Sequence, residues 1–187
     1  MISGAVAELG ATPHETIQCR SFLALMEQYE QALRRLAGAY VAQAADREDL
    51  FQEIAVAIWQ AIPRFRGEAS ERTWLYRIAH NVAISSAARL RRKMQREESI
   101  PESFDRPSQA SDEEQDLLSE EKRRLLIDSV RDLPAVDRQI VLLHLEGLSH
   151  AEIEEVTGMS ETAIATRLTR IREKLKARIH RTNGGNQ

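Results

Sequence analysis

Residues 149–176 read SHAEIEEVTGMSETAIATRLTRIREKLK, and this stretch decides the fold. Ser149 followed by Glu152 has the form of a capping box, which predicts the start of a short helix. Gly158 can adopt the positive φ that ends this helix, and Ser160 stands where a second helix needs a cap. The second helix carries apolar residues at three- and four-residue steps, so one of its faces must be buried. These apolar residues are Ile164, Leu168, Ile171 and Leu175.

A short helix, a tight turn and a longer helix are the elements of a helix-turn-helix, which the sequence extends back to Leu133-Pro134. In this motif the first residues of the second helix meet base edges in the major groove, and its basic flank meets phosphates. A helical hairpin with a charged outer face is the simpler alternative. The cap, the glycine turn and the apolar stripe fall in register, which favours binding to duplex DNA. The candidate DNA-contacting residues are Ser160, Glu161, Thr162, Thr166, Arg167, Arg170 and Lys174.

The rest of the chain is also predicted to be helical. Aromatic residues make up only 5%, Ala, Leu, Arg and Glu are frequent, and no alternating β pattern recurs. One amphipathic helix is predicted between Phe22 and Tyr40. A second begins with Asp46 as its N-cap and ends at Pro63, and a third begins near Ser70. We therefore expect an all-α protein.

Charge divides the chain into segments. The formal net charge of −3 conceals two basic blocks, residues 64–96 and 167–181, with many of the acidic residues between them. The segment between the blocks also holds prolines and serines and has no apolar periodicity, which predicts a flexible acidic linker. We expect two small helical domains, and the predicted boundaries are a disordered tail at 1–18, a helical domain at 19–96, the linker at 97–116 and a helix-turn-helix domain at 117–187.

The first basic block also contains aromatic residues. Phe65, Trp74 and Tyr76 stand among arginines. Aromatic faces combined with positive charge suit separated DNA strands, whose bases can stack or be flipped out of the duplex. For Trp74 itself, a place in the hydrophobic core is the better interpretation.

Three motifs in the amino-terminal half of the chain carry a resemblance to a known family. Residues 46–53 (DREDLFQE), 65–67 (FRG) and 73–81 (TWLYRIAHN) resemble conserved region 2 of the extracytoplasmic-function (ECF) group of sigma-70-family factors. Residues 133–176 resemble region 4 of the same family. The resemblance spans nearly all of residues 20–180 and preserves the order of the two regions.

The resemblance implies a protein that binds core RNA polymerase, directs it to promoters and opens the DNA. It also implies an anti-sigma factor as an inhibitory partner. The implied polymerase-binding residues are Asp46, Asp49, Gln52 and Glu53. The implied contacts with the minus-10 element are Phe65, Arg66, Gly67, Arg77, Asn81, Arg89, Arg91, Arg92 and Lys93. Region 4 would read the minus-35 element as duplex. Where the family pattern has Thr, Val, Lys, Ser and Arg, this chain has Ala163, Ile164, Ala165, Thr166 and Arg167.

Two other classes of function compete with this interpretation. A helix-turn-helix regulator with an N-terminal sensing or dimerisation domain explains residues 133–176 equally well, but it leaves the acidic residues 46–53 and the basic residues 64–96 unexplained. An enzyme is disfavoured, because the sequence offers no nucleophile–base set, phosphate loop or metal constellation. We expect no cofactor and no metal. Cys19 is the only cysteine and no apolar run is long enough to span a membrane, so a cytoplasmic protein is expected.

Overall fold

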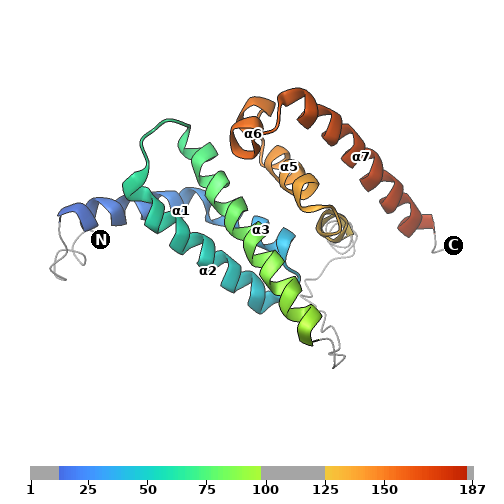
Figure 1. Cartoon of the computed structure of the whole chain (residues 1–187), viewed down its shortest axis with the longest axis horizontal. Helices are drawn as coiled ribbons and strands as arrows, with labels where there is room; N and C mark the ends of the chain where they lie inside the picture. The colour runs from blue at the N-terminus through green and yellow to red at the C-terminus, as the bar shows by residue number, and fades with distance from the viewer. Residues whose placement is uncertain (1–12, 98–124, 185–187) are drawn as a thin grey trace, which may run out of the picture.

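The chain forms helices and connecting loops throughout the part that the computed structural model describes, residues 13–97 and 125–184 (Figure 1). The amino-terminal helices are α1 (Pro13–Tyr40), α2 (Ala44–Ala61), the short 3-10 helix η2 (Ile62–Arg64) and α3 (Glu71–Glu97). Residues 125–131 are helical, and α5 (Ala135–Leu145), α6 (His150–Thr157) and α7 (Glu161–Gly184) follow. The all-α prediction is confirmed for these residues. None of the described helices is long and apolar enough to cross a membrane.

Helix α1 begins earlier than the sequence indicates, so residues 13–18, which the sequence assigns to a disordered tail, are helical. The Gln18 amide donates a hydrogen bond to the backbone carbonyl of Trp59 at 2.7 Å, and Phe22 meets Trp59 edge to face with ring centroids 5.4 Å apart. These contacts with α2 stabilise turns that have no apolar periodicity of their own. Residues 1–12 of the expected tail and all but the first residue of the expected linker lie outside the described residues.

Helix α2 also begins earlier than predicted. Gln43, in an extended backbone conformation, is the N-cap, and Asp46 lies inside the first turn. The prediction that Asp46 caps this helix is therefore wrong. Its carboxylate still lies where the field of the helix N-terminus favours a negative charge.

The predicted apolar stripes form the core. In the amino-terminal part, Leu33, Leu50, Ile54, Ile58 and Leu75 are fully buried, and α1, α2 and α3 pack against one another around them. In the carboxy-terminal part, the fully buried residues are Ile140, Leu143, Ile153, Ile164 and Ile171, which come from α5, α6 and α7. Each helix thus buries the face that its periodicity predicts.

The two parts are packed against each other, with α5 and α6 lying along α3 (Figure 1). One cluster of buried apolar residues runs from Leu25 in α1 to Leu168 in α7. A second cluster joins Ala39 of α1 to Val130, Leu133, Val141 and Ile171. The sequence predicts two separate small cores, whereas the structure has a core shared between the two parts.

Glu146, directly after α5, is the centre of the polar contacts between the two parts. Arg35 of α1 donates to its carboxylate from both Nε and Nη2, at 3.0 and 2.9 Å, and the Tyr76 hydroxyl of α3 donates to it at 3.2 Å. Arg72 donates to the backbone carbonyl of the same residue. The hydrogen bond to Glu146 raises the pKa of Arg35, and burial together with this carboxylate raises the pKa of Tyr76. Fork-to-carboxylate pairs of this kind are among the stronger hydrogen bonds in proteins.

Two arginines complete the junction at the last turn of α1. Arg131 donates to the Gly38 carbonyl from Nε and Nη2, at 2.9 and 2.6 Å. Carbonyls in the last turn of a helix lack intrahelical partners, so Arg131 completes the end of α1 and places a cation where the helix dipole favours one. Arg138 lies with Cζ 5.1 Å from the centroid of the Tyr40 ring and donates to the Leu133 carbonyl at 3.1 Å. Burial lowers the pKa of both arginines.

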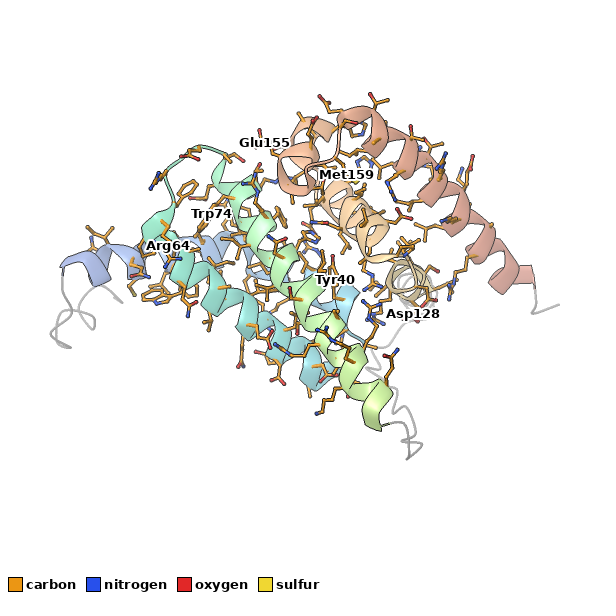
Figure 2. All side chains as sticks on the ribbon, viewed as in Figure 1. Tyr40, Arg64, Trp74, Asp128, Glu155 and Met159 are labelled. Atoms are coloured by element: carbon orange, nitrogen blue, oxygen red, sulfur yellow. The ribbon has the colours of Figure 1, made fainter. Side chains whose placement is uncertain are left out.

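Tyr40 connects this junction to α3 (Figure 2). Its hydroxyl is 3.1 Å from Nδ1 of His80, and the other ring nitrogen of His80 is buried without a hydrogen-bond partner. Because burial penalises the charged imidazolium, the pKa of His80 is lowered to about 3. His80 is therefore neutral in the folded protein at physiological pH.

Replacing His80 tests this burial through the pH dependence of stability. In the unfolded chain His80 takes up a proton below its ordinary pKa of 6.5, whereas in the folded chain it stays neutral down to about 3. The stability that His80 contributes is therefore fully present above pH 6.5, and it is lost progressively as the pH falls from 6.5 toward the folded-state pKa of about 3. Between pH 7 and pH 5 this site should cost about 2 kcal/mol. In urea unfolding, the free energy of unfolding of His80→Leu should fall less between pH 7 and pH 5 than that of the unsubstituted protein. Tyr40→Phe, which keeps His80, should lose as much as the unsubstituted protein. Equal pH dependence in His80→Leu and the unsubstituted protein would contradict this reading.

Glu146→Gln should loosen the junction between the two parts. The amide cannot accept two charge-assisted bonds from Arg35, and an ion pair whose arginine is 58% exposed contributes about 1 kcal/mol. We expect a larger radius of gyration in small-angle X-ray scattering. Glu48→Gln is the matched control, because Glu48 pairs with Arg34 inside the amino-terminal part. If Glu146→Gln and Glu48→Gln scatter alike, the junction does not depend on this carboxylate.

Candidate nucleic-acid interface

The helix-turn-helix is built as its sequence predicts. Ser149 Oγ accepts the backbone N–H of Glu152 at 3.2 Å, and the Glu152 carboxylate accepts the N–H of Ser149 at 2.7 Å, so both bonds of the capping box are present. The backbone hydrogen bond from Ser149 lowers the pKa of Glu152. Gly158 ends α6 with φ of 72°, and a Cβ added there would meet nothing within 4 Å. Glycine is therefore required by the backbone conformation and not by lack of space.

A residue outside the predicted set helps to begin α7. The N–H of Glu161 donates to the carboxylate of Glu154 at 3.2 Å, which satisfies one of the donors left open at the N-terminus of α7. Ser160 directly precedes α7, as predicted, and its carbonyl accepts the N–H of Ile164 at 3.0 Å. A side chain of α6, Glu154, thus contacts the backbone at the start of α7.

One face of α7 gathers most of the predicted minus-35 contacts. Arg167, Arg170 and Lys174 lie three and four residues apart and share this face. A polar surface hollow of about 520 Å³ lies over it, lined by Asp137, Ser160, Thr162, Ala163, Thr166, Arg167, Arg170 and Lys174. Glu161 is exposed at the start of the helix. The opposite face carries the buried apolar stripe, so the outer face of α7 is available to a ligand.

Asp137, in the first turn of α5, contacts two cations of this face. Its Oδ1 accepts a hydrogen bond from Arg167 Nη1 at 2.6 Å, and its Oδ2 lies 3.9 Å from Lys174 Nζ. The Asp137 side chain is 10% exposed and that of Arg167 43%, so the carboxylate lies beneath the surface while the guanidinium reaches it. The position in the first turn of a helix favours a carboxylate.

The predicted minus-10 loop lies between η2 and α3. Phe65 is at the surface and packs against the half-buried Trp74 with ring centroids 4.7 Å apart and planes 39° apart. Trp74 in turn packs against the core cluster. Gly67 has φ of 73°, and Ser70 Oγ accepts the N–H of Thr73 at 3.0 Å, which caps α3. The loop thus exposes Phe65 at the surface while Trp74 holds its ring against the core.

Two predicted minus-10 residues lie further along α3, and one of them is already engaged. Asn81 is exposed. Arg77 is also exposed, but its Nη2 donates to the backbone carbonyl of Glu155 in α6 at 2.6 Å, at the junction of the two parts. Glu155 is labelled in Figure 2. The bond to the Glu155 carbonyl uses one of the five N–H donors of Arg77 and holds its side chain against α6.

The predicted polymerase-binding face and the basic end of α3 meet at one ion pair. Glu53 of α2 accepts a hydrogen bond from Arg89 of α3. The remaining predicted residues of these two sets lie at the surface or partly exposed, namely Asp46, Asp49, Gln52, Arg91, Arg92 and Lys93. Arg66, from the minus-10 set, is exposed in its loop. Within residues 13–97 and 125–184, no group of three His, Cys, Asp or Glu side chains could hold a metal ion.

Sequence reasoning missed the residues that join or position the predicted surfaces. Glu146, Arg35 and Asp137 act through contacts between segments far apart in the chain, and no local pattern marks such residues. Glu154 could have been noticed, since a carboxylate seven residues before the start of α7 stands within reach of its open N–H groups.

Comparisons with known proteins identify the family of both helical parts. Residues 25–93 match the family model for sigma-70 region 2, and residues 123–175 match that for sigma-70 region 4. The ECF RNA polymerase sigma-E factor of Haemophilus influenzae is 30% identical over 167 residues, which cover 86% of this chain and 88% of the relative. The sigma-E factor of Escherichia coli K12 is also 30% identical, over 86% of this chain and 87% of the relative.

Two solved structures have a similar fold. CnrH, solved in complex with the cytosolic domain of CnrY, matches with a TM-score of 0.63 at 23% identity, covering 96% of both chains. The sigma factor RpoE of Bartonella quintana, solved with the anti-sigma factor NepR, matches with a TM-score of 0.66 at 21% identity, covering 86% of this chain and 98% of that one. The chain belongs to the sigma-70 family, in its ECF group. It acts in promoter-directed initiation of transcription.

Ser149→Ala tests the capping box that begins the DNA-binding motif. The substitution leaves the N–H of Glu152 without its partner, and loss of a serine cap costs about 1 kcal/mol. Urea unfolding should show this loss. Ser85→Ala is the matched control, because Ser85 is exposed within α3 and makes no cap, and it should leave stability almost unchanged. Equal stabilities of the two variants would rule out the cap as a stabilising feature.

Proposed function

We propose that this chain docks on core RNA polymerase through α2, reads the minus-35 element as duplex with α7, and holds the minus-10 element as a separated strand with the loop at 65–70 and α3. The observation that carries the proposal is the presence of basic, exposed residues on two helical units of one chain. A single helix-turn-helix could grip a duplex but would not open it. The second surface supplies the contact with unpaired bases that opening requires.

The minus-35 contact rests on the outer face of α7. Thr162 and Thr166 lie in the first two turns of this helix, where a helix-turn-helix meets base edges. Arg170 and Lys174 lie further along and are exposed, in the position from which a basic flank meets phosphates. Ser160, Glu161 and Arg167 complete this proposed surface.

The minus-10 contact rests on Phe65 and Asn81. An exposed aromatic ring fixed by a second ring offers a stacking face for an unpaired base, and an exposed amide offers a donor and an acceptor to its edge. The cations that hold the strand are the flanking arginines and lysine, namely Arg66, Arg77, Arg89, Arg91, Arg92 and Lys93. Arg77 is held by the Glu155 carbonyl in the closed chain, so strand binding through Arg77 competes with this contact and favours separation of the two parts.

The polymerase contact rests on the acidic start of α2, with Asp46, Asp49, Gln52 and Glu53 as the proposed residues. Asp49 and Gln52 are exposed on this helix, away from its buried face. The ion pair between Glu53 and Arg89 joins the polymerase surface to the minus-10 surface, so docking at one can affect the side-chain arrangement of the other.

The partners of the chain follow from the same proposal. They are core RNA polymerase, promoter DNA and an anti-sigma factor, and the likeness to a sigma factor solved with its anti-sigma factor supports the last of these. The chain works without enzymatic chemistry of its own, in the cytoplasm, where polymerase and DNA are found. The alternative, a helix-turn-helix regulator with a sensing domain, is not favoured because residues 25–93 match sigma-70 region 2.

Initiation with purified components tests the proposal. Core RNA polymerase with the chain should start transcription at specific promoters of a genomic pool and make thymines near the start site reactive to permanganate. Asn81→Ala should reduce permanganate reactivity while promoter binding persists, because only the unpaired base loses a contact. Arg170→Ala should weaken binding and reduce the salt slope by about 1. Arg20→Ala, an exposed arginine of α1 outside the proposed surfaces, is the control. Absence of specific initiation on the whole pool would overturn the proposal.

A further inference from the structure

Asp137 is the one acidic residue among those that line the hollow over the DNA-facing side of α7. A carboxylate close to a phosphate backbone repels it, so this position needs a reason. Asp137 is a buried residue of α5, and its carboxylate contacts two cations of α7, Arg167 and Lys174. The carboxylate of α5 thus points toward α7, the recognition helix.

The contact leaves part of the arginine free. Asp137 Oδ1 accepts from Arg167 Nη1 at 2.6 Å, and the Arg167 side chain remains 43% exposed. Its Nε and Nη2 donors form the other edge of the guanidinium, and two parallel N–H groups on one edge match the O6 and N7 acceptors of guanine. The pair therefore holds the arginine in place without using the edge that could read a base.

Lys174 and Arg170 differ from Arg167 in this respect. Lys174 Nζ lies 3.9 Å from Asp137 Oδ2, and its side chain is 61% exposed, so it is only loosely held. Arg170 is exposed on the same face. Long mobile cations suit phosphates, which need charge more than fixed geometry, whereas reading a base edge needs a side chain with little rotamer freedom left to lose.

We propose that Asp137 is a positioning residue that fixes Arg167 as the guanine-reading arginine of the minus-35 contact, while Arg170 and Lys174 serve the phosphates. The inference rests on the proposed function and deepens it by separating the residue that discriminates between bases from those that supply affinity. It also assigns a role to α5, whose first turn supports the recognition helix from the side.

The test measures order and discrimination in the same variants. Arginine side-chain nitrogen relaxation by NMR, on the full chain without DNA, should show Arg167 ordered and Arg170 mobile. Asp137→Ala should make Arg167 as mobile as Arg170. If Arg167 is already mobile in the unsubstituted chain, the proposal is overturned before any DNA is added.

Discrimination is then measured with holoenzyme on a promoter that it initiates from and on single-base substitutions of its minus-35 element. Asp137→Ala should lose about tenfold in preference for guanine at one position, as Arg167→Ala does, and the double variant should lose no more than Arg167→Ala alone. Asp137→Asn, which keeps an acceptor for Nη1, should retain part of the preference. Arg170→Ala should weaken binding to all of these promoters alike.

Two results contradict the inference. If Asp137→Ala tightens binding to every promoter equally, the carboxylate acts only as a repulsive charge. If Asp137→Ala and Arg167→Ala lose preference at different positions, the two residues do not act as a pair. Failure of the proposed function gives a different result, because the holoenzyme would then initiate at no promoter while the NMR order of Arg167 still depended on Asp137.

Discussion

The arrangement of this protein depends on the carboxylate of Glu146. It takes two hydrogen bonds from Arg35 and one from Tyr76, and its backbone carbonyl takes another from Arg72. These donors come from α1 and α3, and the acceptor follows α5, so one residue joins the two parts of the chain. The Glu146 side chain is mostly buried, so leaving its carboxylate unpaired would be costly. Its hydrogen bonds therefore fix the geometry of the junction, while the shared apolar core supplies buried area.

The junction explains how the two proposed DNA surfaces can differ in availability. The outer face of α7 points away from α3 and is open. Arg77 of the minus-10 surface is engaged with the Glu155 carbonyl of α6. The closed chain can therefore offer its proposed duplex-binding face while one residue of its proposed strand-binding face is engaged in the junction. Opening exposes the apolar surface shared between the parts, so it needs other contacts in compensation, and polymerase and promoter can provide them.

Local patterns predicted the helices and most of the surface residues, because caps, glycine turns and apolar stripes act over a few residues. The capping box at Ser149 and the positive φ of Gly158 are examples. The same reasoning failed for residues 13–18, because their helix is stabilised by a contact with Trp59 in another helix. It also failed for Asp46, because α2 begins at Ala44 and Gln43 is its N-cap. The shared core and the contacts of Glu146 and Asp137 join residues distant in the chain, and a single sequence carries no local sign of them. The assignment of residues to minus-10, minus-35 and polymerase contacts came from the family resemblance and stays a prediction.

We expect the closed chain to open when it binds a promoter together with polymerase. The most direct measurement is the distance between spin labels at Gln60→Cys in α2 and Glu173→Cys in α7, in a Cys19→Ser background, by pulsed electron paramagnetic resonance. Both positions are exposed and lie outside the proposed contacts. The free chain should give one short distance, and the promoter complex with core polymerase should give a longer one. The same short distance in both states would contradict the account, because Arg77 would then remain on the Glu155 carbonyl while the promoter is bound.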